Sequence, residues 1–408
     1  MREGDWNVSP HNFDAAVRAG MNLPAEVEVV DLTLREGRQV AGTALTLDQV
    51  LQYARRARAA GFRTLEMHHS EPEEIRRVKE LDLDIAVQSL VHPTASLNPE
   101  TCRREIDESI HVGADIICLS AMVSDYNFSL IQELGGVDFT REAAIEAICE
   151  AVQHGKQQGA TISVLLADHT RLPVDRLRRF SQQLVSAGAD IIRLDDICAP
   201  CMPAVYRHLA AEVKSVIGDA RLAIHSHNDF DLAVASQLAS LEGGADILEG
   251  SVNGMGERAG IPSLASLVAN LEVLYGYDTG VELSAMQELS DFVAATWGIP
   301  VAERFPVVGR NAFSHSVGVH YVDNEWAFNA WMPHVVGNDA YIPMGMFSGP
   351  KASRKRARDL GLGELSDAQA AEVNQLVRQE LRRTQSELSD ERFSQLVAQV
   401  VDAAGAAR

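Results

Sequence analysis

The sequence has no long apolar run, no excess of basic residues and no regular array of cysteines. No stretch reaches the roughly 18 apolar residues of a transmembrane helix, and the first residues lack the apolar core of a secretory signal. The formal net charge of −21 argues against nucleic acid or an anionic membrane as a partner. The five cysteines follow no repeating pattern, and the close pair Cys198 and Cys201 is a weak signal for zinc or redox chemistry. We therefore expect a soluble, cytoplasmic protein that binds neither nucleic acid nor a membrane.

A GxGxxG motif is also absent after the first predicted strand, which disfavours an open, doubly wound dinucleotide-binding sheet. What the chain does have, from about residue 26, is a regular alternation of short β-branched runs with longer amphipathic stretches. The predicted strands are Val27–Leu34, Thr64–His69, Ile85–Val91, Ile116–Ala121, Ile162–Ala167, Ile191–Asp195, Leu222–His227 and Ile247–Val252. Eight strands with intervening helices predict an α/β fold, a (β/α)₈ TIM barrel.

The alternation of predicted strands and helices stops after the last predicted strand. Residues 1–25 form a lead segment, and 26–283 are expected to form the catalytic barrel. Residues 284–350 are irregular, aromatic and punctuated by glycine and proline, which indicates a linker subdomain. Residues 351–408 show helical patterns and are expected to form a small, mostly helical C-terminal subdomain.

The most informative stretch is His225-Ser-His227-Asn-Asp229, which ends an apolar run. Side chains two apart on a strand project from the same face, so both imidazoles would point into one cavity. Neutral imidazole is a strong ligand for divalent metals, although a polar strand end with two satisfied histidines would look the same. The rest of the chain must decide between these two interpretations.

In a (β/α)₈ barrel, active-site groups lie at the carboxyl ends of the strands. Strand one ends in Arg35 and Glu36, and the seventh strand lies two positions away around a closed barrel. Glu36 can therefore reach both histidines, and two imidazoles with one carboxylate are a typical catalytic metal site. Polar residues at other strand ends join this set: Glu66, His68, Asp168, Arg171, Asp196 and Asn253.

Four motifs in this order resemble those of the DRE-TIM metallolyase superfamily, most closely its homocitrate synthase and 2-isopropylmalate synthase branch. They are Asp31-x-Thr-Leu-Arg35-Glu36-Gly-x-Gln39, His225-x-His227-Asn-Asp, Gly254-x-Gly256-Glu-Arg258-x-Gly260, and Asn311-Ala-Phe-Ser-His315-Ser-Val-Gly-Val-His320 followed by Ser348-Gly349. The resemblance implies a Claisen-type acyltransferase that condenses acetyl-CoA with a 2-oxo acid and releases CoA.

The resemblance also implies a role for each matching residue. A divalent ion (Mg²⁺, Mn²⁺ or Zn²⁺) is expected on Glu36, His225 and His227. Arg35 would stabilise the developing alkoxide, Gln39 would help orient the substrate, and His320 would move the methyl proton of acetyl-CoA. In relatives that segment comes from the neighbouring subunit, so a homodimer is expected. Substrate contacts are expected from Arg171, Glu66, His68, Ile197 and Asn253.

Several positions depart from the pattern of these relatives. Ile197 stands where relatives carry a substrate-contacting threonine, Ala167 replaces a glutamate, and Phe328 aligns with a tyrosine. These departures predict an oxo acid other than the commonest ones. The main alternative function is a lyase that runs the reverse cleavage, as in the hydroxymethylglutaryl-CoA lyase branch. An iron oxygenase, which favours β-rich folds, and a barrel without activity agree less well with the residues above.

Overall fold

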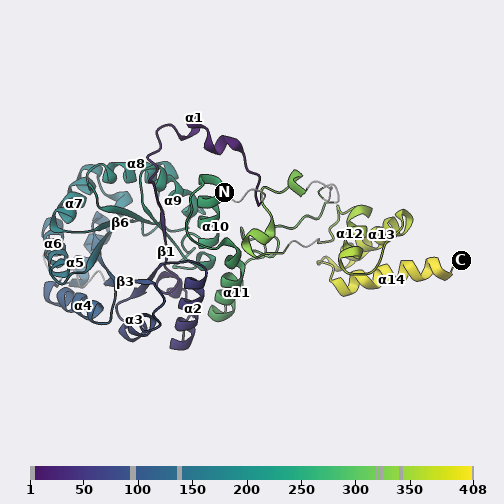
Figure 1. Ribbon diagram of the computed structural model, residues 1–408, viewed down its shortest axis with the longest axis horizontal. Coiled ribbons are helices and arrows are strands. Elements are labelled where there is room, and N and C mark those ends of the chain that lie inside the picture. Colours follow the sequence, from purple (N-terminus) through teal and green to yellow (C-terminus); the bar gives the residue numbers. More distant parts are fainter. Residues whose placement is uncertain are drawn as a thin grey trace. The chain divides into compact units, whose positions relative to one another are not determined.

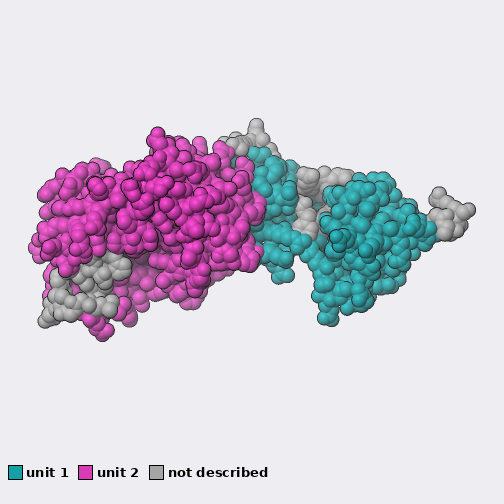
Figure 2. All heavy atoms as spheres, turned by 90° about the horizontal axis from the view of Figure 1, so that it is seen from below, with its two compact units in different colours: residues 1–9, 302–408 teal, residues 10–301 magenta. Residues whose placement is uncertain are grey.

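The computed structural model describes residues 5–91, 98–135, 140–317, 320, 325–339 and 343–406, which fall into two compact units. One unit comprises Pro10–Val301, and the other comprises Met1–Ser9 with Ala302–Arg408 (Figure 2). Within the described residues, no helix combines the length and the apolarity needed to cross a bilayer.

The first unit contains a closed barrel in which the eight described strands pair in sequence order, all parallel (Figure 1). The strands are β1 Glu28–Asp31, β2 Thr64–His68, β3 Ala86–Val91, β4 Ile116–Met122, β5 Thr161–Ala167, β6 Ile191–Asp195, β7 Arg221–His225 and β8 Ile247–Gly250. The TIM barrel predicted from the alternating pattern is confirmed. Each strand falls within its predicted run or extends it by one residue.

Helices alternate with the strands around this barrel, and the short α1 precedes the first strand (Figure 1). They are α1 Ala15–Arg18, α2 Leu47–Ala59, α3 Pro72–Lys79, α4 Pro99–His111, α5 Asp125–Gly135, α6 Arg141–Gln157, α7 Val174–Ala187, α8 Pro203–Lys214, α9 Ala233–Glu242, α10 Leu264–Ala269 and α11 Met286–Trp297. Local signals set their ends. Thr46 and Gln49 form a capping box at the start of α2, and Gly188 ends α7 with a φ of 111° that favours glycine.

The interior of the barrel is built in levels, each contributed by alternate strands. Near the amino ends of the strands, Ile116, Ile191 and Ile247 of the even-numbered strands pack in an apolar cluster with Val30 and Ala223 of the odd-numbered strands. Two residues further along β4, β6 and β8, the side chains are Cys118, Arg193 and Glu249, all of them buried. The barrel therefore changes from apolar to ionic as the strands approach their carboxyl ends.

The second unit ends in three helices, α12 Pro350–Asp359, α13 Asp367–Thr384 and α14 Asp390–Ala406, within the described residues. These helices share an apolar core that includes Ala357, Val373, Val377, Phe393 and Val397. The helical C-terminal region expected from the sequence is thus confirmed. The finer division at residues 283 and 350 remains a prediction, and the first compact unit continues through α11 to Val301.

Candidate active site

The end of β1 is shaped by a buried carboxylate. Asp31 Oδ1 accepts hydrogen bonds from the Thr33 backbone N–H at 2.8 Å and from its hydroxyl at 2.6 Å, while the Tyr53 hydroxyl donates to the other oxygen. The chain then turns into a short 3₁₀ helix, Glu36–Arg38. This turn leaves Arg35 and Glu36 at 7% and 2% exposure, although two adjacent charges would ordinarily face water.

Arg35 and Glu36 are tied to each other and to β2. Arg35 donates from Nη1 to Glu36 Oε2 and from Nε to Glu66 Oε1. With its amide nitrogen turned toward Glu36, the exposed Gln39 donates to Oε2 at 2.9 Å and to Oε1 at 3.1 Å. The backbone N–H of Glu257 also donates to Glu36 Oε1, at 3.2 Å. The structure therefore brings Arg35, Glu36, Gln39 and Glu66 together.

The two histidines at the end of β7 have their rings close together, with centroids 4.9 Å apart. The prediction that both lie on the strand is wrong, because β7 ends at His225 and His227 lies in the following loop. Asp196 explains the turn away from the ladder, since its carboxylate accepts from the backbone N–H of His227 at 3.0 Å. The two rings nevertheless share one cavity, as the spacing predicts.

A carboxylate engages Nδ1 of each ring. His225 Nδ1 lies 3.0 Å from Glu249 Oε2, and His227 Nδ1 lies 2.9 Å from Asp196 Oδ1. An imidazole that donates from Nδ1 to a carboxylate presents an unprotonated Nε2, which is the usual arrangement behind a metal ligand. His227 Nε2 lies 3.7 Å from Glu36 Oε1, and ligand atoms of Glu36, His225 and His227 all fall within 4.8 Å of one another. This donor set fits a divalent cation.

Burial and charge shift the pKa values of this cluster in different directions. Burial lowers the pKa of His225 to about 3, which keeps this imidazole neutral, as a ligand must be. Burial opposes protonation of His227 too, but hydrogen bonds to Asp196 and Glu36 outweigh it and raise its pKa to about 10, so this imidazole must give up a proton to a cation that binds it. For Glu36, the adjacent Arg35 outweighs burial and lowers the pKa of the carboxyl.

The loop after β8 packs closely against Glu36. A Cβ added at Gly256 would lie 3.1 Å from Glu36 Cγ, and one at Gly260 would lie 1.9 Å from the Gly254 carbonyl oxygen. Asn253 adopts a left-handed φ of 59°, and its side chain accepts from the Ser290 hydroxyl at 2.6 Å. The glycines of this motif therefore let the loop backbone approach the carboxylate closely.

The predicted substrate residues lie at different places around the barrel mouth. Arg171 donates from Nε to Asp168 at 2.7 Å and lies 4.2 Å from the centre of the Tyr126 ring. Ile197 packs against a small apolar cluster made of Leu90, Cys118, Leu165 and Ala167. His68 lies at the end of β2 with its Nδ1 2.8 Å from the Ser70 hydroxyl.

His320 belongs to the other compact unit, where its ring centroid lies 4.1 Å from that of Phe328 and 5.2 Å from that of His315. Phe328, which is expected to align with a tyrosine of relatives, is 45% exposed. The catalytic role of His320 stays a prediction.

Sequence reasoning missed Arg193 and Glu249, and it did not see Asp196 as the partner of His227. Arg193 is the bulkiest of the fully buried side chains described, and its Nη2 lies 2.6 Å from Glu249 Oε2. A signal was available, because Arg193 interrupts the apolar run of β6, and Glu249 that of β8, at positions where a barrel strand is buried on both faces.

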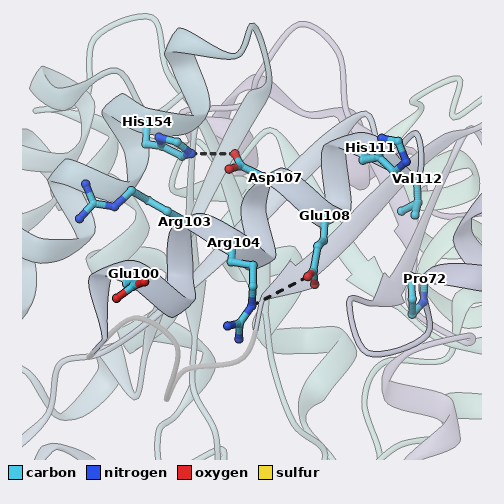
Figure 3. Close-up of a pocket in the computed structure, with 9 residues that line it drawn as sticks. All are labelled: Pro72, Glu100, Arg103, Arg104, Asp107, Glu108, His111, Val112 and His154. Carbon is cyan, nitrogen blue, oxygen red and sulfur yellow. Dashed lines mark hydrogen bonds and ion pairs between the residues drawn. The ribbon is translucent and has the colours of Figure 1, made fainter.

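A separate hollow of about 820 Å³ lies on the outer surface of the barrel along α4 (Figure 3). Two pairs of its charged side chains face each other: His154 Nε2 lies 2.7 Å from Asp107 Oδ1, and Arg104 Nε lies 3.9 Å from Glu108 Oε1 (Figure 3). None of the predicted site residues lines it, and mutual pairing of exposed charges is ordinary surface structure.

A closed (β/α)₈ barrel with an acid–imidazole–guanidinium cluster at the carboxyl ends of its strands defines a TIM-barrel protein with a candidate metal centre. The HMGL-like family model matches residues 26–293. The chain belongs to this family, the DRE-TIM group, as the motifs predict.

The chain is also similar to individual proteins of known name and to solved structures. The 2-isopropylmalate synthase of Sulfolobus acidocaldarius is 31% identical over 353 residues, covering 85% of this chain and 89% of the relative. Homocitrate synthase AksA of Methanopyrus kandleri is 28% identical over 393 residues, covering 94% of this chain and 95% of the relative. Among solved structures, the HMG-CoA lyase of Brucella melitensis matches with a TM-score of 0.58 at 18% identity, covering 67% of this chain and all (100%) of that chain. This last match supports the fold alone.

Proposed function

We propose that this protein is an acyltransferase that condenses acetyl-CoA with a 2-oxo acid. The observation that carries the proposal is the buried cluster in which Arg35 contacts Glu36, and Glu36 faces His227 beside His225. Relatives named 2-isopropylmalate synthase and homocitrate synthase support the same reaction class. A divalent cation held by Glu36, His225 and His227 would supply Lewis-acid polarisation of the keto group.

The chain's own residues account for the other requirements of the reaction. A base, for which His320 is our candidate from the neighbouring subunit of a homodimer, removes a proton from the methyl group of acetyl-CoA. The methyl carbon forms a bond to the keto carbon, and the keto oxygen becomes an alkoxide that is then protonated. Water hydrolyses the thioester, which releases CoA and leaves a carboxylate.

Arg35 is placed to stabilise the alkoxide. Its hydrogen bonds to Glu36 and Glu66 use two of the five N–H groups of a guanidinium, which leaves donors for an oxygen of the substrate. Gln39 and Asn253 remain our candidates for orienting groups beside the cluster.

We further propose that the distal group of the oxo acid meets an apolar wall. Ala167 pairs with Asp195, and Asp195 pairs with His225, so Ala167 lies at the level of the candidate metal centre. Ile197 packs on the cluster that contains Ala167 and Leu90. Arg171 would contact the far end of the substrate from the rim, where its side chain is 32% exposed.

The test is thiol release from acetyl-CoA, measured against a panel of 2-oxo acids with and without a chelator. Chelator-sensitive release that depends on one oxo acid is the expected result. Cleavage of a 3-hydroxyacyl-CoA without condensation would instead identify a lyase. Thiol release from no oxo acid in the presence of Mg²⁺, Mn²⁺ or Zn²⁺ would reject the proposal, and a strong preference for 2-oxoglutarate would reject the apolar wall.

A further inference from the structure

One level of the barrel interior is ionic, and Arg193 is at its centre. The level is formed by Glu66 of β2, Cys118 of β4, Arg193 of β6 and Glu249 of β8, which are the alternate strands that contribute to one layer of a TIM barrel. Glu66, Cys118 and Arg193 are 0% exposed and Glu249 is 1% exposed. Three ionisable side chains thus lie in an interior that such barrels ordinarily fill with branched apolar residues.

Arg193 holds both carboxylates of this level at once. Its Nη1 donates to Glu66 Oε2 and lies 3.6 Å from Cys118 Sγ, while its Nη2 lies 2.6 Å from Glu249 Oε2. A planar guanidinium can hold two carboxylates in a fixed geometry, which a single ammonium group cannot do.

Each of these carboxylates supports a different part of the candidate site above. Glu66 accepts from Nε of Arg35, the residue placed to stabilise the alkoxide. Glu249 lies 3.0 Å from Nδ1 of His225, a candidate metal ligand. Arg193 Nη2 itself lies 3.4 Å from that same nitrogen. An unbroken chain of polar contacts therefore runs from Arg35 through Arg193 to His225.

We propose that Arg193 is a positioning residue, which aligns the alkoxide-stabilising Arg35 and the metal ligand His225 through Glu66 and Glu249. The inference rests on the proposed function for the role of Arg35, but its effect on metal binding can be measured independently. Fixing the Glu249 carboxylate against Nδ1 of His225 sets the ring orientation and leaves Nε2 for the cation. Fixing Glu66 sets the position of the Arg35 guanidinium.

The experiment compares Mn²⁺ binding by the metal-free full-length protein with that of Arg193→Lys, using isothermal titration calorimetry. Lysine keeps the positive charge but lacks the fork, so Mn²⁺ affinity should fall about 10- to 100-fold. At saturating Mn²⁺, kcat should fall by a similar factor while the KM for acetyl-CoA stays within about twofold, because Arg193 has no contact with the substrate. Thermal unfolding and circular dichroism establish that the variant is folded.

The matched control is Arg221→Lys. It makes the same substitution at the amino end of β7, at the other end of that strand from His225, where Arg221 pairs with Glu28 at 2.6 Å. It should bind Mn²⁺ like the unaltered protein. If Arg193→Lys does not fold, the double variant Arg193→Met/Glu66→Gln removes one charge of each sign and leaves Glu249 facing His225. The same loss of Mn²⁺ affinity is expected there.

A folded Arg193 variant whose Mn²⁺ affinity and kcat both stay within twofold of the unaltered protein would overturn the inference. Failure of both variants to fold would overturn it as well, because Arg193 would then be required by the barrel itself. An unaltered protein that binds Mn²⁺ but releases no thiol would reject the proposed function alone, and the Mn²⁺ comparison would still decide the role of Arg193.

Discussion

The buried Asp31 makes a prediction about the pH dependence of stability. Burial raises the pKa of its carboxyl from 3.8 to about 6, although hydrogen bonds from Thr33 and Tyr53 oppose the shift. Because the folded state holds the proton more tightly, this group contributes stability below pH 3.8 that is lost as the pH rises through about 6. The shift corresponds to a loss of about 3 kcal/mol in all, of which about 2 kcal/mol falls between pH 4.5 and 8.

The perturbation is Asp31→Asn, which keeps the shape of the side chain and removes the titration. The amide oxygen can still accept from Thr33, and the Tyr53 hydroxyl can rotate to accept from the amide nitrogen. Relative to the unaltered protein, the free energy of unfolding of the variant should therefore rise by about 2 kcal/mol between pH 4.5 and 8.

The assay is urea unfolding followed by tryptophan fluorescence, with linear extrapolation at each pH. Trp297 is the single tryptophan of Pro10–Val301 and packs 5.8 Å from the Tyr53 ring, so it reports on this region once Trp6, Trp326 and Trp331 are replaced by Phe. The exposed Asp48→Asn is the control for the same substitution outside the core. A flat difference for Asp31→Asn, within about 0.5 kcal/mol, would refute the reasoning.

Three further predictions concern the site and its support. Gln237→Leu should lower the free energy of unfolding by about 2–4 kcal/mol in urea titrations. The buried Gln237 amide donates to the Ile224 and Glu249 carbonyl oxygens and accepts from the Glu249 N–H, at 2.9–3.0 Å. A loss below about 1 kcal/mol would contradict this prediction. Gly256→Ala should lower kcat about tenfold with little change in thermal stability, because its Cβ would displace Glu36 by a few tenths of an ångström. Glu36→Gln should lower thiol release at least about 100-fold and weaken Mn²⁺ binding. Metal removal from the unaltered protein should abolish thiol release reversibly, and turnover that resists a chelator would contradict this prediction.

Much of the fold was predictable because the periodicity of apolar residues and the glycines that end helices are local signals in the sequence. The apolar runs marked all eight described strands, and Gly188 marked the end of a helix as expected. The metal donors were also predictable, since carboxyl strand ends converge in a barrel and the spacing of His225 and His227 is short. The resemblance to known motifs then supplied the roles of residues such as Arg35.

The remaining features depend on contacts between residues that lie far apart in the sequence. Arg193 could be seen as a charge in an apolar run, but its two partners are distant in sequence. Glu66 lies 127 residues before it on β2, and Glu249 lies after it on β8. Asp196 turns His227 off the strand through a hydrogen bond across 31 residues, which no local propensity encodes. Gln237 resembles any polar residue of an amphipathic helix until its amide is seen to bridge β7 and β8.

The ionic level also bears on how the barrel can assemble. Glu66 belongs to the first four strands, whereas Arg193 and Glu249 belong to the last four. In an isolated half-barrel these charges would remain hydrated, and they lose their water together when the two halves close. We therefore expect closure to be a late, concerted step in folding. Separately expressed halves of this barrel should associate poorly unless Glu66, Arg193 and Glu249 are first exchanged for apolar residues of similar volume.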